Sequence, residues 1–315
     1  MIAGLCSKGL LALVLFLGLS SPISSQSDAS PVSKPYQSRY ALPFEEQARF
    51  QAREILYALA RAYPSQIERV QFRDGDWAVR VLGQWFYFAE GRLLPPEDRH
   101  RLDEFDPYPF YVYERERPET PTYTDEQAQA IEEVVSRLDQ DPVRRHPGFL
   151  NALWRVDDHH SAWDRQKTTY FLGIQTLVHR EILEDLAAVE ESILELAQSD
   201  RRIADFVQRL SGAHGYTYRE VDGTDSLSYH AYGVAIDLIP RGFQRWQMYW
   251  RWAREAELPW YRIARDDLFL VPEPIVGAFE AHGFVWGGKW QFYDTIHFEY
   301  RPELLLLNGF HHDQR

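Results

Sequence analysis

The segment Val234–Ile239 constrains the fold most, because its hydrophobicity alternates with the period of a β-strand. One face of this strand is apolar and is expected to face a core; it consists of Val234, Ile236 and Leu238. Ala235 and Asp237 point to the other face, where the small alanine leaves open space beside the carboxylate. The segment therefore predicts a strand that presents one carboxylate on an open face.

Gly233 and His230 precede this strand. Glycine permits a sharp turn, which would bring His230 back over the face that carries Asp237. An imidazole and a carboxylate that converge on one open spot are ligands that Zn²⁺ uses. A hydrogen bond between the two side chains, without a metal, explains this first cluster about equally well.

A second cluster lies farther along the chain. Gly287-Gly288 predicts a tight turn with close backbone approach. Asp294 and His297 are three residues apart, so one helical turn would put both on the same side. His297 would then complete a His/Asp/His site with an open fourth position for water, which is typical of catalytic zinc. Asp294 would lie beside that water, where a general base belongs.

Together, the pattern Ser228-x-His230-x-x-Gly233-x-Ala235-x-Asp237 and the pattern Asp294-x-x-His297 resemble a known family. It comprises the zinc D-alanyl-D-alanine carboxypeptidases and L-alanyl-D-glutamate endopeptidases, which cut the peptide stems of bacterial cell walls. Their fold also occurs in D-Ala-D-Ala dipeptidases and the hedgehog signalling domain. The resemblance covers about residues 170–305. It implies that Zn²⁺ is the cofactor, that Asp294 is the catalytic acid/base, and that the metal ligands are His230, Asp237 and His297.

The bond that is cut stays open between alternatives. The lead-in Trp286–Trp290 looks most like the endopeptidase branch. Many carboxypeptidases of the family carry Glu in place of Asp294 and Trp before the histidine, where this chain has Thr295-Ile296. We expect an exported zinc metallopeptidase acting on peptidoglycan stem peptides, with endopeptidase or D-Ala-D-Ala carboxypeptidase specificity. The third hypothesis is a zinc-binding module without turnover. The presence of Asp294 argues against it, because a binding module needs no base beside the metal.

Further side chains are candidates around this site. Arg219 lies just before the first motif, and the resemblance implies that an arginine at the cleft stabilises the oxyanion. The alternative for Arg219 is a surface ion pair with Glu220 or Asp222. Ser228 is expected to make a hydrogen bond that supports the site and not to act as a nucleophile. A nucleophilic serine is typically surrounded by a Gly-x-Ser-x-Gly pattern, which is absent around Ser228. Three aromatic residues are candidates for the substrate cleft, although an aromatic residue beside a glycine turn is more typical of a core: Tyr232, Trp286 and Trp290.

The charge balance excludes other classes of function. The 315 residues hold 47 Asp+Glu against 34 Lys+Arg, a net charge of −13, which argues against a nucleic-acid partner.

None of the lysines follows a serine by three places, so the Ser-x-x-Lys of serine penicillin-binding enzymes is absent. The single cysteine, Cys6, lies near the N-terminus, so a metal site must use His and Asp. No pattern predicts an oligomeric state.

The N-terminus predicts export. Lys8 precedes an apolar run, Gly9–Leu19, and a Ser/Pro-rich exit follows, as in a secretory signal peptide. The run is shorter than the roughly 20 residues that span a bilayer. We expect residues 1–25 to be a signal peptide that is cleaved, with an uncleaved anchor as the alternative. The mature chain is then periplasmic or extracellular without a stable membrane span.

The rest of the chain predicts an α+β fold. A small mixed or antiparallel sheet flanked by helices is expected to carry the zinc site within residues 165–308. A linker (26–43) and an accessory region of open role (44–150) precede it. The accessory region is expected to hold a helix, a β-meander and an irregular connection: 44–63, then 69–72, 77–82 and 85–89, then 95–124. Helices are expected at Thr124–Asp139, Val178–Gln198 and Ile203–Leu210.

Overall fold

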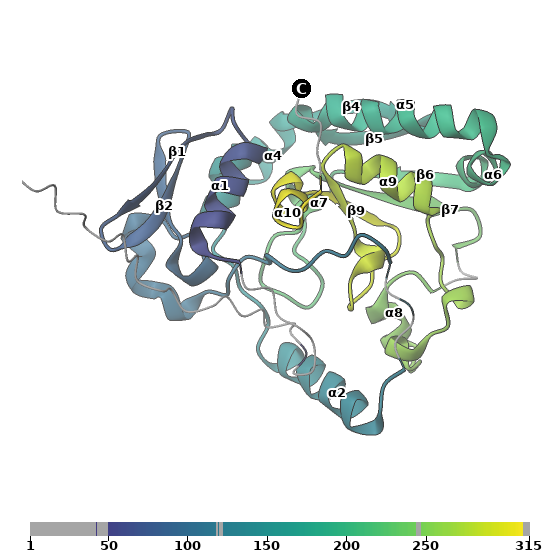
Figure 1. Ribbon diagram of the computed structural model, residues 1–315, viewed down its shortest axis with the longest axis horizontal. Coiled ribbons are helices and arrows are strands. Elements are labelled where there is room, and N and C mark those ends of the chain that lie inside the picture. The colour runs from purple at the N-terminus through teal and green to yellow at the C-terminus, as the bar shows by residue number, and fades with distance from the viewer. Residues whose placement is uncertain (1–41, 43–49, 118, 120–121, 244–246, 311–315) are drawn as a thin grey trace, which may run out of the picture. The chain divides into compact units, whose positions relative to one another are not determined.

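The computed structural model describes residues 42, 50–117, 119, 122–243 and 247–310 (Figure 1). The α-helices are α1 (Ala52–Ala62), α2 (Asp125–Gln140), α3 (Gly148–Trp154), α4 (His159–Arg165), α5 (Leu183–Ser199), α6 (Arg201–Arg209), α7 (Tyr229–Tyr232), α8 (Trp250–Glu255), α9 (Glu273–Ala281) and α10 (Pro302–Leu307). The strands are β1 (Ile67–Arg73), β2 (Asp76–Val81), β3 (Gln84–Tyr87), β4 (Gln166–Phe171), β5 (Ile174–His179), β6 (Leu210–His214), β7 (Ala235–Pro240), β8 (Phe284–Trp286) and β9 (His297–Tyr300). Short 3₁₀ segments include η2 (Pro96–Glu104), η3 (Arg180–Ile182) and η7 (Gly287–Lys289). The fold is α+β, as the sequence predicts.

The predicted signal peptide (1–25) lies outside the described residues, as does the predicted linker (26–43) except for Leu42. The first part of the helix expected from residue 44 also lies outside them. Among the residues that the structure describes, no helix has both the length and the apolarity needed to cross a bilayer.

Strands β1, β2 and β3 form the predicted antiparallel meander, in that order. Asp74-Gly75 makes the first turn, with both residues at positive φ. The second turn uses Leu82-Gly83, also at positive φ, instead of the predicted Gly83-Gln84, because Gln84 already pairs with Val81 in the ladder. Turns of this type match the twist of antiparallel strands.

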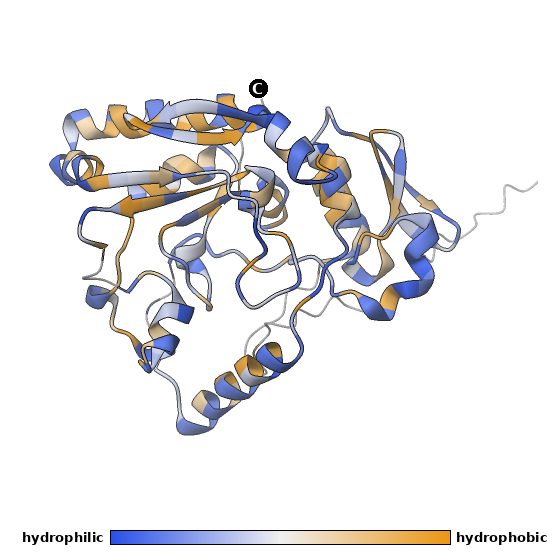
Figure 2. Cartoon of the chain, turned by 180° about the vertical axis from the view of Figure 1, so that it is seen from behind, coloured by the Kyte–Doolittle hydropathy of each residue, from blue (hydrophilic) through white to orange (hydrophobic). Residues whose placement is uncertain are grey.

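Helix α2 confirms the helix predicted at Thr124–Asp139. Thr124 accepts a hydrogen bond from the Gln127 backbone N–H, and the Gln127 side chain accepts from the Thr124 N–H, which closes a capping box. One side of the helix is buried: Ile131, Val134, Val135 and Leu138. Figure 2 shows this division into hydrophobic and hydrophilic sides.

The helix predicted at Val178–Gln198 is wrong at its start. Residues 166–179 form a hairpin, β4–β5, which turns at Leu172-Gly173 with both residues at positive φ. Helix α5 begins only at Leu183. Val178 in the strand and Ile182 in η3 are both fully buried, so they continued the apolar stripe of α5 by coincidence of spacing. The predicted helix Ile203–Leu210 is α6, which begins two residues earlier.

The site is carried by a four-stranded antiparallel sheet with the order β6-β7-β9-β8. Helix α9 lies against this sheet (Figure 1). Its Phe279 ring stacks on Phe298 of β9 with centroids 3.8 Å apart. One apolar cluster joins this sheet to α1, α5 and the meander, and it includes Leu59, Phe86, Val189, Ile236 and Phe298. The apolar core therefore runs across residue 150, where the accessory region was expected to end.

Candidate metal centre

Helix α7 presents His230. Ser228 caps this helix, and its side chain accepts a hydrogen bond from the His230 backbone N–H at 3.2 Å. The helix ends at Gly233, whose φ of +73° is unfavourable for any residue with a side chain. A Cβ there would also lie 1.9 Å from Gln166 Oε1. The predicted sharp turn is therefore present, and it leads directly into strand β7.

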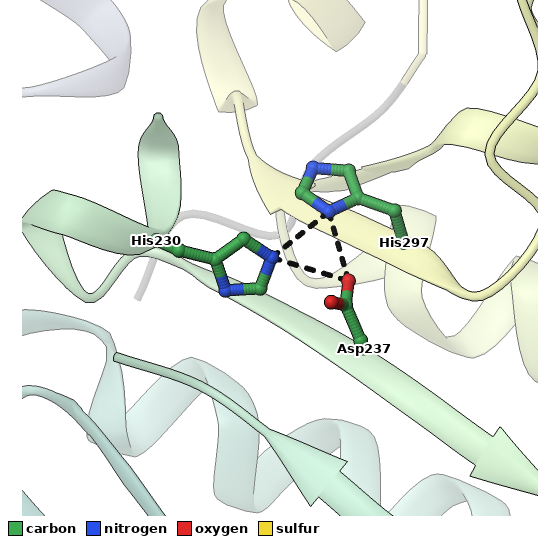
Figure 3. Close-up of side chains that lie close together, drawn as sticks. All are labelled: His230, Asp237 and His297. Carbon is green, nitrogen blue, oxygen red and sulfur yellow. Dashed lines mark hydrogen bonds and ion pairs between the residues drawn. The ribbon is translucent and has the colours of Figure 1, made fainter. Parts of the chain in front are cut away.

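Asp237 and His297 come from neighbouring strands. They are directly opposite each other in the antiparallel pair β7–β9, so their side chains leave the sheet together. His230 Nε2 lies 3.1 Å from Asp237 Oδ1 and 3.2 Å from His297 Nδ1 (Figure 3). The distance between Asp237 Oδ1 and His297 Nδ1 is 3.0 Å. Zinc bonds of about 2.0–2.1 Å in a tetrahedron require ligand atoms about 3.3 Å apart. The three atoms are thus spaced as one face of such a site and could hold a metal ion.

The second nitrogen of each imidazole is held from outside the group. His230 Nδ1 bonds the Gly215 carbonyl oxygen, so Nδ1 carries the proton and Nε2 presents its lone pair to the centre. His297 Nε2 lies 3.3 Å from Glu299 Oε2. Burial opposes ionisation of Glu299, but His297 and Arg301 lower its pKa below the ordinary value. Glu299 therefore accepts from Nε2–H and leaves Nδ1 free to coordinate, an arrangement typical of metal-binding histidines.

The electrostatics of this site favour a cation. Burial opposes ionisation of Asp237, but His230 and His297 lower its pKa below the ordinary range. Burial lowers the pKa of His297, yet hydrogen bonds to Asp237 and Glu299 raise it to about 10. Protein groups alone thus hold an extra proton at His297 because negative charge surrounds it. A divalent cation would satisfy the same demand, so the donor set fits zinc.

Asp294 reaches the site by a β-turn and not by the predicted helical turn. The His297 N–H donates to the Asp294 carbonyl oxygen at 3.3 Å, immediately before β9 begins. Asp294 Oδ1 is buried without a hydrogen-bond partner among the described residues. Burial, followed by the charge of Asp237, raises the pKa of Asp294 to about 7, while His297 and Arg219 act to lower it. Asp294 can therefore exchange a proton near neutral pH.

Arg219 influences this carboxylate through its charge. Its side chain is exposed, and its guanidinium donates to the backbone oxygen of Glu220 at 3.3 Å. Its charge is among the influences that lower the pKa of Asp294. Among the described ion pairs, Asp222 is joined to Arg251 and none involves Arg219. The alternative of a surface ion pair with Glu220 or Asp222 is therefore not seen.

The aromatic candidates differ in position. Trp286 is 1 % exposed, and its indole N–H donates to the Thr295 carbonyl oxygen at 2.8 Å. Tyr232 is equally buried, and its hydroxyl donates to Asn151 at 3.0 Å. Neither ring has a face that a substrate could contact. Trp290 is half-buried with its ring centroid 5.6 Å from that of His297, so it borders the site.

Two groups that orient the histidines, Glu299 and Gly215, lie outside the residues predicted from the sequence motifs. Glu299 follows His297 by two residues on a strand, so period-2 alternation places both on one face and is a signal that could have found it. Gly215 acts through its backbone carbonyl oxygen, which no side-chain pattern reveals.

Residues 222–300 match a family described as D-alanyl-D-alanine carboxypeptidase. The matched range contains His230, Asp237, Asp294 and His297, and it supports the resemblance at the level of the peptidase family. Residues 55–110 match a second family, described only as a domain of unknown function. Neither the curated proteins nor the solved structures include a match to this chain.

Proposed function

We propose that this chain is an exported zinc metallopeptidase that hydrolyses peptide bonds in peptidoglycan stem peptides. The carrying observation is the convergence of three ligand atoms, 3.0–3.2 Å apart, beside a carboxyl group whose pKa is about 7. The match of residues 222–300 to a peptidase family supports the same reaction class. Export rests on the predicted signal peptide.

His230, Asp237 and His297 would hold the zinc ion. When bound, zinc lowers the pKa of a water molecule from 15.7 to roughly 7 and polarises a substrate carbonyl. Asp294 Oδ1 accepts a proton from the attacking water as the new C–O bond forms. It then donates that proton to the departing amine nitrogen as the C–N bond breaks. A pKa near the working pH suits a group that must both accept and donate a proton.

Arg219 supports this reaction electrostatically. The guanidinium lies close enough to Asp294 to lower the pKa of that carboxyl, and it is exposed to incoming ligands. We therefore propose that it stabilises negative charge that develops on the carbonyl oxygen. Trp290, half-buried beside His297, is the aromatic residue that we propose contacts the substrate.

Two specificities are candidates, and specific observations favour each of them. The matched family is described as a carboxypeptidase, which favours removal of terminal D-Ala. The Trp286–Trp290 lead-in and an aspartate at position 294 favour cleavage between L-Ala and D-Glu. Both reactions use the same groups and differ in how the cleft presents the peptide.

Defined muropeptides distinguish these outcomes. The purified mature protein is incubated with pentapeptide- and tetrapeptide-bearing muropeptides, with zinc or with a chelator, and the products are identified by mass. Loss of one terminal alanine shows carboxypeptidase action, and release of the peptide after L-Ala shows endopeptidase action. Products that persist in chelator overturn the zinc mechanism. A zinc-loaded protein that gives no product overturns the peptidase and favours a binding module.

A further inference from the structure

A buried chain of charged side chains leads away from the metal centre along β9. Glu299 Oε2 contacts His297, and its other oxygen accepts a hydrogen bond from Arg301 Nη1 at 3.3 Å. Arg301 Nε in turn donates to Glu303 at the start of α10. The side chains of Glu299, Arg301 and Glu303 are 9 %, 2 % and 4 % exposed. A buried series of hydrogen-bonded charged side chains thus extends from His297 into the protein interior.

Residues of the accessory region contact the far end of this series of side chains, at Arg301 and Glu303. The hydroxyl of Tyr63, which directly follows α1, donates to Glu303 Oε2 at 2.7 Å across 240 positions of sequence. Arg301 Nη2 donates to the carbonyl oxygen of Pro109 at 2.9 Å. The guanidinium of Arg301 also lies over the ring of Phe110, 5.9 Å from its centroid. Residues of the accessory region therefore cover Arg301 and Glu303.

These contacts fix the orientation of Glu299. Arg301 is held by acceptors on three sides, which leaves its planar guanidinium one orientation. That orientation determines where one oxygen of Glu299 lies and therefore where the other oxygen meets His297. Removing the Tyr63 hydroxyl would leave a buried oxygen of Glu303 without its hydrogen-bond donor, and an incompletely satisfied buried network is costly enough to favour readjustment of its members. These contacts form a continuous path from Tyr63 to His297.

We propose that residues 52–113 are an integral support of the metal centre, and that Tyr63 is a positioning residue acting through Glu303, Arg301 and Glu299 on His297. This inference rests on the proposed function only in taking His297 as a metal ligand. It gives a role to the region that matches a domain of unknown function.

The test uses the full mature chain and a matched pair of tyrosine variants. Tyr63→Phe removes the hydroxyl that donates to Glu303 at the far end of the buried series. Tyr87→Phe removes a hydroxyl from an equally buried tyrosine of the same region, which donates to a carboxylate oxygen of Asp74 instead. Zinc dissociation constants are measured by competition with a chromophoric chelator. Visible spectra of the cobalt-substituted proteins report the ligand geometry.

Tyr63→Phe is expected to weaken zinc binding roughly 3- to 10-fold, less than the roughly 10- to 100-fold typical of losing a group in direct contact with a ligand. Its cobalt spectrum is expected to change. Tyr87→Phe is expected to match the wild type in both measurements, even if both variants melt earlier. Equal zinc affinities for the two variants, together with unchanged cobalt spectra, would overturn the proposal.

Glu303→Gln provides a second, independent measurement. If Tyr63 acts through Glu303, the double variant weakens zinc binding less than the product of the two single effects. Strictly multiplicative effects would overturn the proposed route. Wild-type protein that binds zinc without hydrolysing muropeptides fails the proposed function and leaves this test intact. A wild type that binds no zinc overturns both.

Discussion

The Asp294 backbone N–H donates to the carbonyl oxygen of Gly287 at 3.1 Å, and the two backbones meet more closely than a side chain would allow. A Cβ at position 287 would lie 2.5 Å from the Asp294 carbonyl oxygen. That same oxygen accepts the N–H of His297. The glycine is therefore required for the turn that places both the proposed base and a proposed ligand.

Gly287→Ala is expected to reduce muropeptide hydrolysis at least about tenfold at saturating zinc, because small displacements of catalytic groups are costly. Gly277→Ala is the matched control. Gly277 lies inside α9, and a Cβ there would meet nothing within 4 Å, so this variant should keep activity and gain slight helix stability. Turnover and zinc affinity are measured for both. Wild-type turnover in Gly287→Ala would contradict the argument.

Asp294→Asn is expected to keep zinc and to lose turnover by roughly 10²- to 10⁴-fold, the usual contribution of a general acid–base group. The amide is similar in shape but cannot accept the water proton. Zinc content and the rate of product formation are measured together. Asp103→Asn, on an exposed residue of η2, controls for loss of one carboxylate. Near-normal turnover with zinc retained would remove Asp294 from this role.

The same substitution is expected to stabilise the metal-free protein at neutral pH. Folding raises the pKa of Asp294 from 3.8 to about 7, so the folded state binds this proton more tightly than the unfolded state. The resulting stability is complete below about pH 4 and is lost as the pH rises to about 7. It corresponds to no more than about 4 kcal/mol. Asn at this position does not titrate.

Chelator-treated wild type and Asp294→Asn are compared by thermal unfolding at several pH values. Their melting temperatures should converge near pH 4, and the variant should be the more stable above about pH 7. The opposite pH trend of Asp237, whose pKa is lowered, is present in both proteins and largely cancels. A constant difference at all pH values would show that Asp294 does not titrate in this window.

Arg219→Ala is expected to move the acid limb of the kcat/KM profile to higher pH. The Arg219 charge acts to lower the pKa of Asp294, so removing it raises that pKa and postpones formation of the carboxylate. Arg219→Lys keeps the charge and should leave the limb nearly in place. The profile is measured on the zinc-loaded protein with one muropeptide. An unshifted limb in Arg219→Ala would place the guanidinium outside the electrostatic reach of Asp294.

Local sequence pattern determined the parts of this protein that local physics governs. The meander and α2 follow from turn residues, capping residues and periodicity within one element. Alternation along β7 and the turn at Gly233 were enough to place Asp237 near His230, and the structure brings His297 to the same point. Period counting failed at Val178, where two short buried elements happened to match one helical stripe.

Only the tertiary structure decided which groups surround the ligands. The cross-strand register sets Asp237 opposite His297, and register depends on the packing of the whole sheet. The contact between Tyr63 and Glu303 joins residues 240 positions apart, beyond the reach of any periodicity. A buried charged group is stable only when it is paired or hydrogen-bonded, and the tertiary fold determines which distant residues lie close enough to serve as partners. The sequence by itself identified the candidate metal ligands and the candidate base. The packing of distant segments determined their orientation and shifted their pKa values.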